Sequence, residues 1–163
     1  MGVLIRPLQI GDTAVVREIL IGCNVFSSEE VDVASQLMME SLASGLDGDY
    51  PLFVAEATGV VRGYVCVGKT PLTVSTWHLY WLCVHPAAQR IGIARALQEH
   101  AESFVRSRGG ERLALETSSR PDYERTRLFY RRAGYTQVGL IPDFYKRGDD
   151  CVMFCKALNR ASS

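Results

Sequence analysis

The chain has 163 residues, the size of one ordinary domain, and its content of 47% hydrophobic and 22% charged residues is typical of a globular protein. Eighteen lysines and arginines balance eighteen aspartates and glutamates, so the chain lacks the excess of positive charge that nucleic-acid binding usually requires. Arg6 and Pro7 interrupt the apolar stretch near the N-terminus, and no segment approaches the roughly 18 apolar residues of a membrane span. We therefore expect a single domain over residues 1–163, in a soluble cytoplasmic protein that binds neither nucleic acid nor membrane.

The first half of the chain is predicted to contain two helices and four strands. Asp12 or Thr13 can cap the first helix, which runs to about residue 20. Ser27 and Glu30 stand at the spacing of a capping box in front of the second helix, which ends at Gly45. The four strands, joined by polar turns into an antiparallel arrangement, cover residues 3–8, 52–57, 60–68 and 74–84.

The second half alternates between strands and helices. After residue 86 an amphipathic helical pattern runs to Gly109, and a second helix over residues 123–134 stops at Gly134. A strand between two helices implies a crossover and parallel pairing, whereas the first half is antiparallel. The prediction is therefore a mixed α/β sheet with helices on both faces. The strands of this half cover residues 112–117, 135–141 and 151–158.

The five cysteines are odd in number, form no CxxC pair and lie mostly within apolar runs. This distribution is typical of buried, reduced thiols in a cytosolic protein. Cys151 and Cys155 are four residues apart, but no histidine or further cysteine stands near them at the spacing of a zinc site. We expect no metal.

The segment from Val84 to Ala94 carries the sharpest signal, because a buried strand ends there, a short loop turns and a helix begins. Backbone N–H groups at a helix N-terminus point toward one spot, and the helix dipole favours an anion there. Gly92 lets the backbone approach a phosphate closely. An ordinary strand-to-helix connection with an incidental glycine is the alternative. The predicted pyrophosphate contacts are Gln89, Arg90, Ile91, Gly92, Ile93 and Ala94.

Residues 63–70, GYVCVGKT, match the P-loop pattern letter for letter. A P-loop needs a strand before it and a helix after it, but this segment is itself rich in strand-forming residues and leads into more β-type sequence. The pattern therefore does not predict a nucleotide hydrolase.

Two blocks in the second half resemble the GNAT acetyltransferases, and the resemblance extends over essentially the whole chain. The first, YWLCVHPAAQRIGIARAL over residues 80–97, is similar to the family's strand, pyrophosphate loop and helix that bind acetyl-CoA. The second, RLALETSSRPDYERTRLFYRRAGY over residues 112–135, resembles the following strand and the helix that carries a Tyr-x-x-x-Gly-Phe/Tyr signature. The tail over residues 141–158 is similar to the closing hairpin of many bacterial members.

The resemblance implies a twisted, mostly antiparallel sheet of about seven strands, in which a central parallel pair splays apart to admit the pantetheine arm. It implies an N-acetyltransferase that moves an acetyl group from acetyl-CoA to a primary amine by direct attack, without a covalent enzyme intermediate. A domain of the same fold that binds or senses an acyl-CoA without turnover is the alternative. The chain departs from the family at Arg90, where a glycine is usual, at Ile91, where a basic residue is usual, and at Tyr123, where an asparagine that contacts pantetheine is frequent.

The resemblance also suggests roles for individual residues. Backbone N–H groups near Cys83 and Val84 would polarise the thioester carbonyl. Tyr130, in the tyrosine signature, would protonate the departing CoA thiolate, although a tyrosine packed in the core is the alternative. His78 or Glu116 would take the proton from the amine, unless water does so.

The acceptor predicted from the sequence is either a small-molecule amine or a protein amino group, and the sequence does not decide between them. A homodimer is possible as well. Several acidic residues fall in predicted loops, where they could surround a cationic amine or simply face solvent. They are Asp47, Asp49, Asp143, Asp149 and Asp150.

Overall fold

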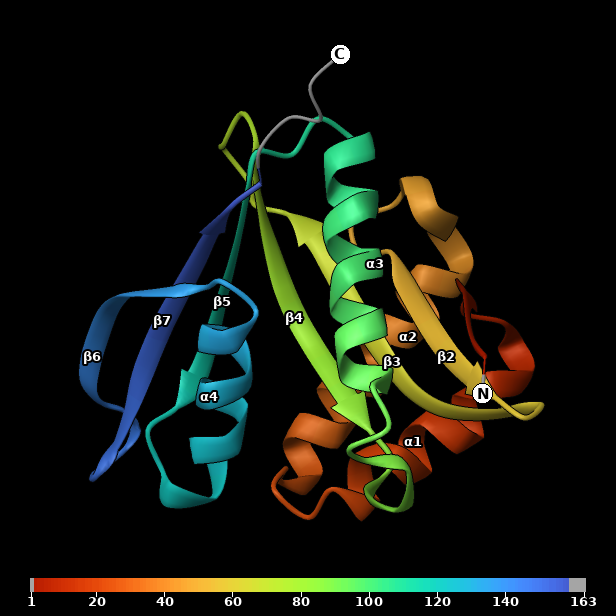
Figure 1. Cartoon of the computed structure of the whole chain (residues 1–163), viewed down its shortest axis with the longest axis horizontal. Helices are drawn as coiled ribbons and strands as arrows, with labels where there is room; N and C mark the ends of the chain where they lie inside the picture. The colour runs from red at the N-terminus through yellow and green to blue at the C-terminus, as the bar shows by residue number, and fades with distance from the viewer. Residues whose placement is uncertain (1, 159–163) are drawn as a thin grey trace.

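The computed structural model describes residues 2–158, which form one seven-stranded sheet with helices on both faces (Figure 1). The strand order is β1-β2-β3-β4-β5-β7-β6, and every neighbouring pair is antiparallel except β4 with β5. The predicted fold class is confirmed. The strands are β1 (Val3–Pro7), β2 (Leu52–Ala57), β3 (Val60–Lys69), β4 (Thr76–Val84), β5 (Arg112–Ser118), β6 (Thr136–Lys146) and β7 (Asp149–Ala157).

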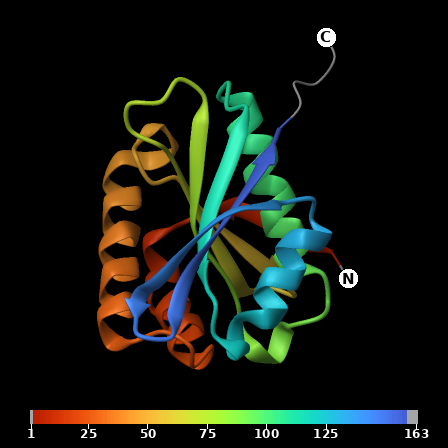
Figure 2. The same cartoon turned by 90° about the vertical axis from the view of Figure 1, so that its left-hand side faces the viewer.

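Two helices cover each face of the sheet, as the side view in Figure 2 makes plain. Side chains of α1 and α2 pack on one face, against residues such as Val54 and Tyr64. Side chains of α3 and α4 pack on the other, with Phe53 and Val65. Neighbouring residues of one strand thus serve opposite cores, which explains why β2 and β3 are almost continuously apolar. The helices are α1 (Thr13–Gly22), α2 (Ser28–Ser44), α3 (Ile93–Ser107) and α4 (Glu124–Arg132).

The predicted capping box at the start of α2 is confirmed. The backbone N–H of Glu30 donates to the Ser27 hydroxyl at 3.2 Å, and the Glu30 carboxylate accepts from the Ser27 N–H at 2.7 Å. Gly45, with φ of 66°, ends the helix as predicted. These contacts fix the first turn of α2, next to the loop between α1 and α2, which forms one wall of a cavity.

The closing hairpin is longer than predicted. We expected the sixth strand to end at residue 141, but β6 continues to Lys146, with an interruption in its pairing to β7 between Ile141 and Lys146. Pro142 has no N–H to donate and Asp143 has a positive φ of 53°, so this stretch bows out of the ladder and resembles a loop in sequence. Asp149, placed by the sequence in a loop, is instead the first residue of β7.

The segment that matches the P-loop pattern lies within β3 except for its last residue, Thr70, and it leads to β4 and not to the helix that a phosphate-binding loop requires. Within residues 2–158 no helix combines the length and the apolar character needed to cross a bilayer.

Candidate functional site

The sheet opens along the single parallel pair. β4 and β5 are paired only through Thr76–His78 on one strand and Arg112–Ala114 on the other. Beyond these residues β4 continues along β3 and β5 continues along β7, so the two strands diverge, which is visible as a V in Figure 1. Within the described chain, no strand pairs with the inner edge of β4 after His78. Its backbone groups are available to a ligand that behaves as an added strand.

A β-bulge lies on this free stretch of β4. Trp81 stands opposite Cys66 and Leu79 opposite Val67, which leaves Tyr80 without a counterpart on β3. As a result Tyr80 and Trp81, although consecutive, both pack against the core on the side of α1 and α2. The bulge therefore places two aromatic rings on one side of the opening.

Alternation of the backbone indicates which N–H groups of β4 face the opening. The N–H of His85 donates to the Arg62 carbonyl of β3 at 2.7 Å. Since successive residues of a strand point their N–H groups in opposite directions, that of Val84 is directed toward β5 and that of Cys83 toward β3. Of the two residues singled out in the sequence, Val84 is thus the one whose N–H faces the gap. The Cys83 side chain is buried on the α1 side, near Cys23, whose thiol lies 3.6 Å from the Val84 carbonyl.

The loop between β4 and α3 has the backbone of an anion site. Gly92, with φ of 87°, precedes α3 and supplies no side-chain cap, so the first N–H groups of this helix have no partner within the helix. Arg90 also has a positive φ, of 68°. The tight turn brings the loop to the mouth of a groove that runs along α3.

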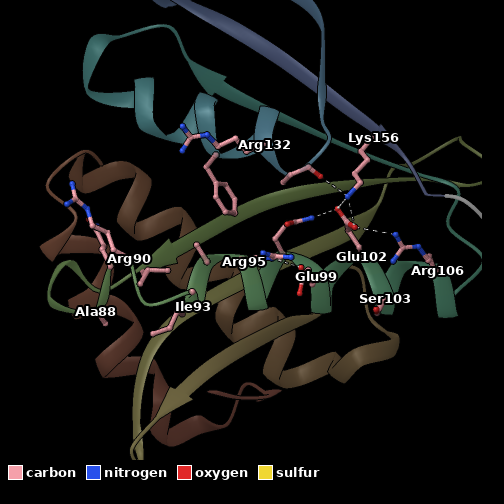
Figure 3. A pocket seen from close by; sticks show the side chains of 17 residues that line it. Ala88, Arg90, Ile93, Arg95, Glu99, Glu102, Ser103, Arg106, Arg132 and Lys156 are labelled. Carbon is pink, nitrogen blue, oxygen red and sulfur yellow. Dashed lines mark hydrogen bonds and ion pairs between the residues drawn. The ribbon is translucent and has the colours of Figure 1, made fainter. Parts of the chain in front are cut away.

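This groove has a volume of about 830 Å³ and lies between α3 and α4, with Lys156 of β7 at its far end (Figure 3). Arg132 of α4 and Arg90 of the loop flank the end near the start of α3. Cationic side chains outnumber acidic ones along the groove, as phosphate binding requires. Of the predicted pyrophosphate contacts, Ile91 is 56% exposed and does not line the groove. The others do: Gln89, Arg90, Gly92, Ile93 and Ala94.

The far end of the groove contains a buried ion cluster centred on Glu102, which is 3% exposed. Lys156 Nζ lies 2.8 and 2.9 Å from its two carboxylate oxygens, and Arg106 lies 3.3 Å from one of them. Lys156 also donates to the Ala133 carbonyl at 2.8 Å. The cluster joins α3 to β7 and the end of α4, and it neutralises the carboxylate.

A second cavity, of about 510 Å³, lies in the opening between β4 and β5. The loop after α1, the bulged part of β4, the end of β5 and the β6–β7 hairpin all contribute to its walls. Phe26 and Trp81 meet there edge to face, with ring centroids 5.3 Å apart. Arg120 and Tyr123 donate to the Val25 carbonyl at 3.3 and 3.5 Å, so they tie the β5–α4 loop to the α1–α2 loop beside this cavity.

Tyr123 lines the second cavity, and burial is the main reason that its pKa is raised to about 12. Tyr130 also lines this cavity, although it is only 5% exposed. Its ring packs against Phe129 and Tyr135, at centroid distances of 5.2 and 5.4 Å. Burial, with a smaller contribution from Cys83, raises the pKa of Tyr130 well above the usual value for tyrosine, so the hydroxyl keeps its proton at neutral pH. Tyr130 therefore combines a core position with access to the opening.

His78 and Glu116 lie near one another at the closed end of the V, and neither lines the two cavities. Burial lowers the pKa of His78, and the charge of Glu116 partly opposes this effect. His78 is therefore neutral at pH 7 and able to accept a proton. Glu116 itself is exposed.

The structure sets one acidic residue apart from the five that the sequence offered either as partners of a cationic amine or as solvent-facing residues. Asp149 was assigned to a loop, but it is 4% exposed and lines the second cavity, where the Ser118 hydroxyl donates to its Oδ1. The position depends on the pairing of β7 with β5, which has no local signal in the sequence. Among residues 2–158, no group of three or more histidine, cysteine or acidic residues is arranged to hold a metal ion.

Comparisons with known proteins agree with this geometry. A family model described as the acetyltransferase (GNAT) family matches residues 15–135. An uncharacterized N-acetyltransferase, MJ1530 of Methanocaldococcus jannaschii, is 29% identical over 142 residues, which cover 80% of this chain and 88% of that protein.

Two solved structures illustrate the similarity of fold. A crystal structure assigned to the GNAT acetyltransferases, from Desulfovibrio desulfuricans, superposes with a TM-score of 0.92 at 35% identity and covers 97% of this chain and 100% of its own. YncA of Salmonella typhimurium, solved with acetyl-CoA, has a TM-score of 0.77 at 20% identity, with coverage of 100% and 98%.

Proposed function

This chain belongs to the GNAT acetyltransferase family and is an N-acetyltransferase that uses acetyl-CoA, and we propose that it transfers the acetyl group directly to a primary amine, with both substrates bound together. The observation that carries the proposal is the succession of the α3 N-terminus, the free edge of β4 and the second cavity, which together would form a path for the cosubstrate and the acceptor. One end of this path suits a phosphate, its middle suits an extended amide chain, and its far end is large enough for an acceptor.

The chain's own residues divide the binding of the cosubstrate between them. The N–H groups at the start of α3 and the side chains of Gln89 and Arg90 would hold the pyrophosphate. The free edge of β4 would pair with the amides of the pantetheine arm. YncA, which has the same fold, was solved with acetyl-CoA.

For the reaction itself, the Val84 N–H is directed into the opening and would stabilise the oxyanion that forms when the amine attacks the thioester. Tyr130, which is protonated at neutral pH and lines the cavity, would give its proton to the departing thiolate. The amine attacks the carbonyl carbon, the carbon–sulfur bond breaks, and the thiol leaves with the tyrosine proton.

An amine with a pKa of about 10.4 must lose a proton before it can attack, which costs on the order of 4 kcal/mol at neutral pH. His78 is neutral at this pH and lies on β4, while Glu116 lies on β5 beside it. We assign the removal of this proton to the pair, acting through ordered water because neither side chain lines the cavity.

The proposal is tested by a screen of amines with acetyl-CoA, in which release of free thiol is measured. Intersecting lines in a double-reciprocal analysis are expected for a ternary complex, whereas parallel lines would indicate a covalent intermediate and contradict direct transfer. Binding of acetyl-CoA should also raise the melting temperature by mass action. Binding without thiol release, with every amine tested, would favour a sensor over an enzyme.

A further inference from the structure

The described residues include three buried carboxylates, and they differ in what neutralises them. Asp12 is 7% exposed, and the guanidinium of Arg6 donates to both of its carboxylate oxygens, at 2.7 and 3.0 Å. Glu102 is held by Lys156 and Arg106, as described above. Both carboxylates thus follow the usual rule that a charge removed from water is paired with an opposite charge.

Asp149 does not follow this rule. It is 4% exposed, and its side chain accepts a hydrogen bond from the hydroxyl of Ser118, a neutral group. No lysine, arginine or histidine within residues 2–158 forms an ion pair with it. One neutral hydroxyl leaves the carboxylate without a direct ionic partner among these residues.

The cations nearest to Asp149 are engaged elsewhere or face solvent. Arg120 is close enough to feel its charge, but the guanidinium donates to both oxygens of Asp122, at 3.1 and 3.2 Å, and to the Val25 carbonyl. Lys146 faces Asp149 across the β6–β7 hairpin and is exposed. Among residues 2–158, Asp149 therefore has no cation in direct contact, although its side chain lines a cavity.

We propose that Asp149 binds a positively charged amino group of the acceptor. This inference rests on the proposed function, and it deepens it by naming the acceptor as a primary ammonium carried on an apolar skeleton. An uncompensated buried carboxylate is costly unless a ligand supplies the missing charge, and the second cavity is where the acceptor is expected. Burial at the edge of the cavity removes competing water and strengthens the attraction.

The other walls of the cavity fit the carbon skeleton of such an amine. Phe26, Tyr80, Trp81 and Tyr145 supply aromatic surface around the opening. Aromatic rings bury methylene or aryl groups and attract cations to their faces. Glu30 adds a second negative charge to the lining, which also contains Arg120, paired with Asp122, and the exposed Lys146.

Binding can be measured apart from turnover, with CoA present to fill the cosubstrate site. Phenethylammonium and phenethyl alcohol have the same shape and differ in charge. By titration calorimetry, the wild-type protein should bind the ammonium at least about tenfold more tightly than the alcohol, the effect of one hydrogen-bonded charge. Asp149→Asn, which keeps the oxygen that accepts from Ser118, should remove this preference and leave the affinity for CoA unchanged.

Two matched controls separate a binding role from a structural one. Asp12→Asn breaks a buried ion pair, so it should lower the melting temperature and keep the preference for the ammonium. Asp149→Asn removes an uncompensated charge, so it should leave the melting temperature unchanged or raise it. Lys146→Met removes the cation across the hairpin and should not weaken the binding of the ammonium.

Kinetics distinguish which nitrogen Asp149 holds. If Asp149 holds the nitrogen that is acetylated, Asp149→Asn raises the KM for phenethylamine. If Asp149 holds a second nitrogen of the acceptor, Asp149→Asn raises only the KM for a linear diamine. The assignment would be overturned if the wild-type protein showed no preference for the ammonium, a result that can be obtained without any variant. It would also be overturned if a folded Asp149→Asn protein retained the preference and both KM values. Neither result affects acetyl transfer as such, which fails only if no amine releases thiol from acetyl-CoA.

Discussion

The proposed phosphate loop offers a clean test of how acetyl-CoA is held, because Gly92 at the start of α3 has a matched control in Gly109 beyond the end of the same helix. Gly92 precedes α3 with φ of 87°, and Gly109 follows it with φ of 77°. An added Cβ would meet no atom within 4 Å at either position. Alanine at each site therefore causes the same backbone strain, but only Gly92 lines the groove.

The strain of an L-residue in the left-handed region is about 1–2 kcal/mol, so both alanine variants should melt about 2–8 °C below the wild type. The Cβ at Gly92 also enters the space through which the phosphate approaches the backbone. Loss of one hydrogen bond to a charged group is worth about 1.5–3 kcal/mol, which corresponds to a decrease in acetyl-CoA affinity of about 10- to 150-fold. Gly109→Ala should bind acetyl-CoA as the wild type does.

The assay is titration calorimetry with acetyl-CoA on both variants, accompanied by thermal melts. Gly92→Glu adds negative charge at the same place and should abolish binding. If Gly92→Ala binds acetyl-CoA within about threefold of Gly109→Ala, while the two melt together, the loop at the start of α3 does not hold the pyrophosphate and the reasoning fails.

Three further predictions concern individual side chains. Tyr130→Phe should lower kcat by about 10²- to 10⁴-fold and leave the affinity for acetyl-CoA unchanged. The control Tyr64→Phe removes a buried hydroxyl that has no hydrogen-bond partner within residues 2–158, and it should leave kcat unchanged. A single-turnover rate for Tyr130→Phe within about threefold of the wild type would return Tyr130 to a packing role. If His78 is the base, the acid limb of kcat/KM against pH lies below 6.5, and His78→Gln abolishes this limb. Glu116→Gln moves the limb to still lower pH, because a charge that raises the pKa of His78 is lost. A pH profile that neither variant alters contradicts both assignments. The Arg6 guanidinium lowers the pKa of Asp12, so the stability that this pair contributes is present above about pH 4 and is lost as pH falls through the lowered pKa. In urea denaturation, the free energies of unfolding of the wild type and of Asp12→Asn should therefore converge at acidic pH. A difference between them that stays constant with pH would refute this prediction.

Local signals in the sequence were enough to predict much of the fold. The ends of α2 follow from a capping box and a glycine, and the position of α3 follows from an amphipathic pattern after a strand. The signal for the proposed phosphate loop is equally local, because its turn, its glycine and the start of its helix lie within ten residues of one another. These features depend on neighbours along the chain, which a sequence displays directly.

Other features arise from pairing between distant segments and had no such signal. The bulge that puts Tyr80 and Trp81 on one side of the sheet depends on the register between β3 and β4. Asp149 is buried because β7 lies beside β5 and brings it to Ser118. From the sequence alone Asp149 could not be distinguished from the other acidic residues of the tail, and only the structure shows that it is buried and lines the second cavity.

The divergence of β4 and β5 also has a mechanical consequence. The sheet consists of two blades, β1–β4 and β5–β7, hinged by the short parallel ladder and tied by the Glu102–Lys156 ion pair and by the contacts of Arg120 and Tyr123 with Val25. A ligand that pairs along β4 between the blades keeps them apart and also links them, because it fills the opening and extends the hydrogen-bonded ladder. Slow amide exchange should then spread from the hinge toward the tips of both blades as acetyl-CoA saturates the protein, so that the cell's supply of the cosubstrate also sets how stiff the enzyme is.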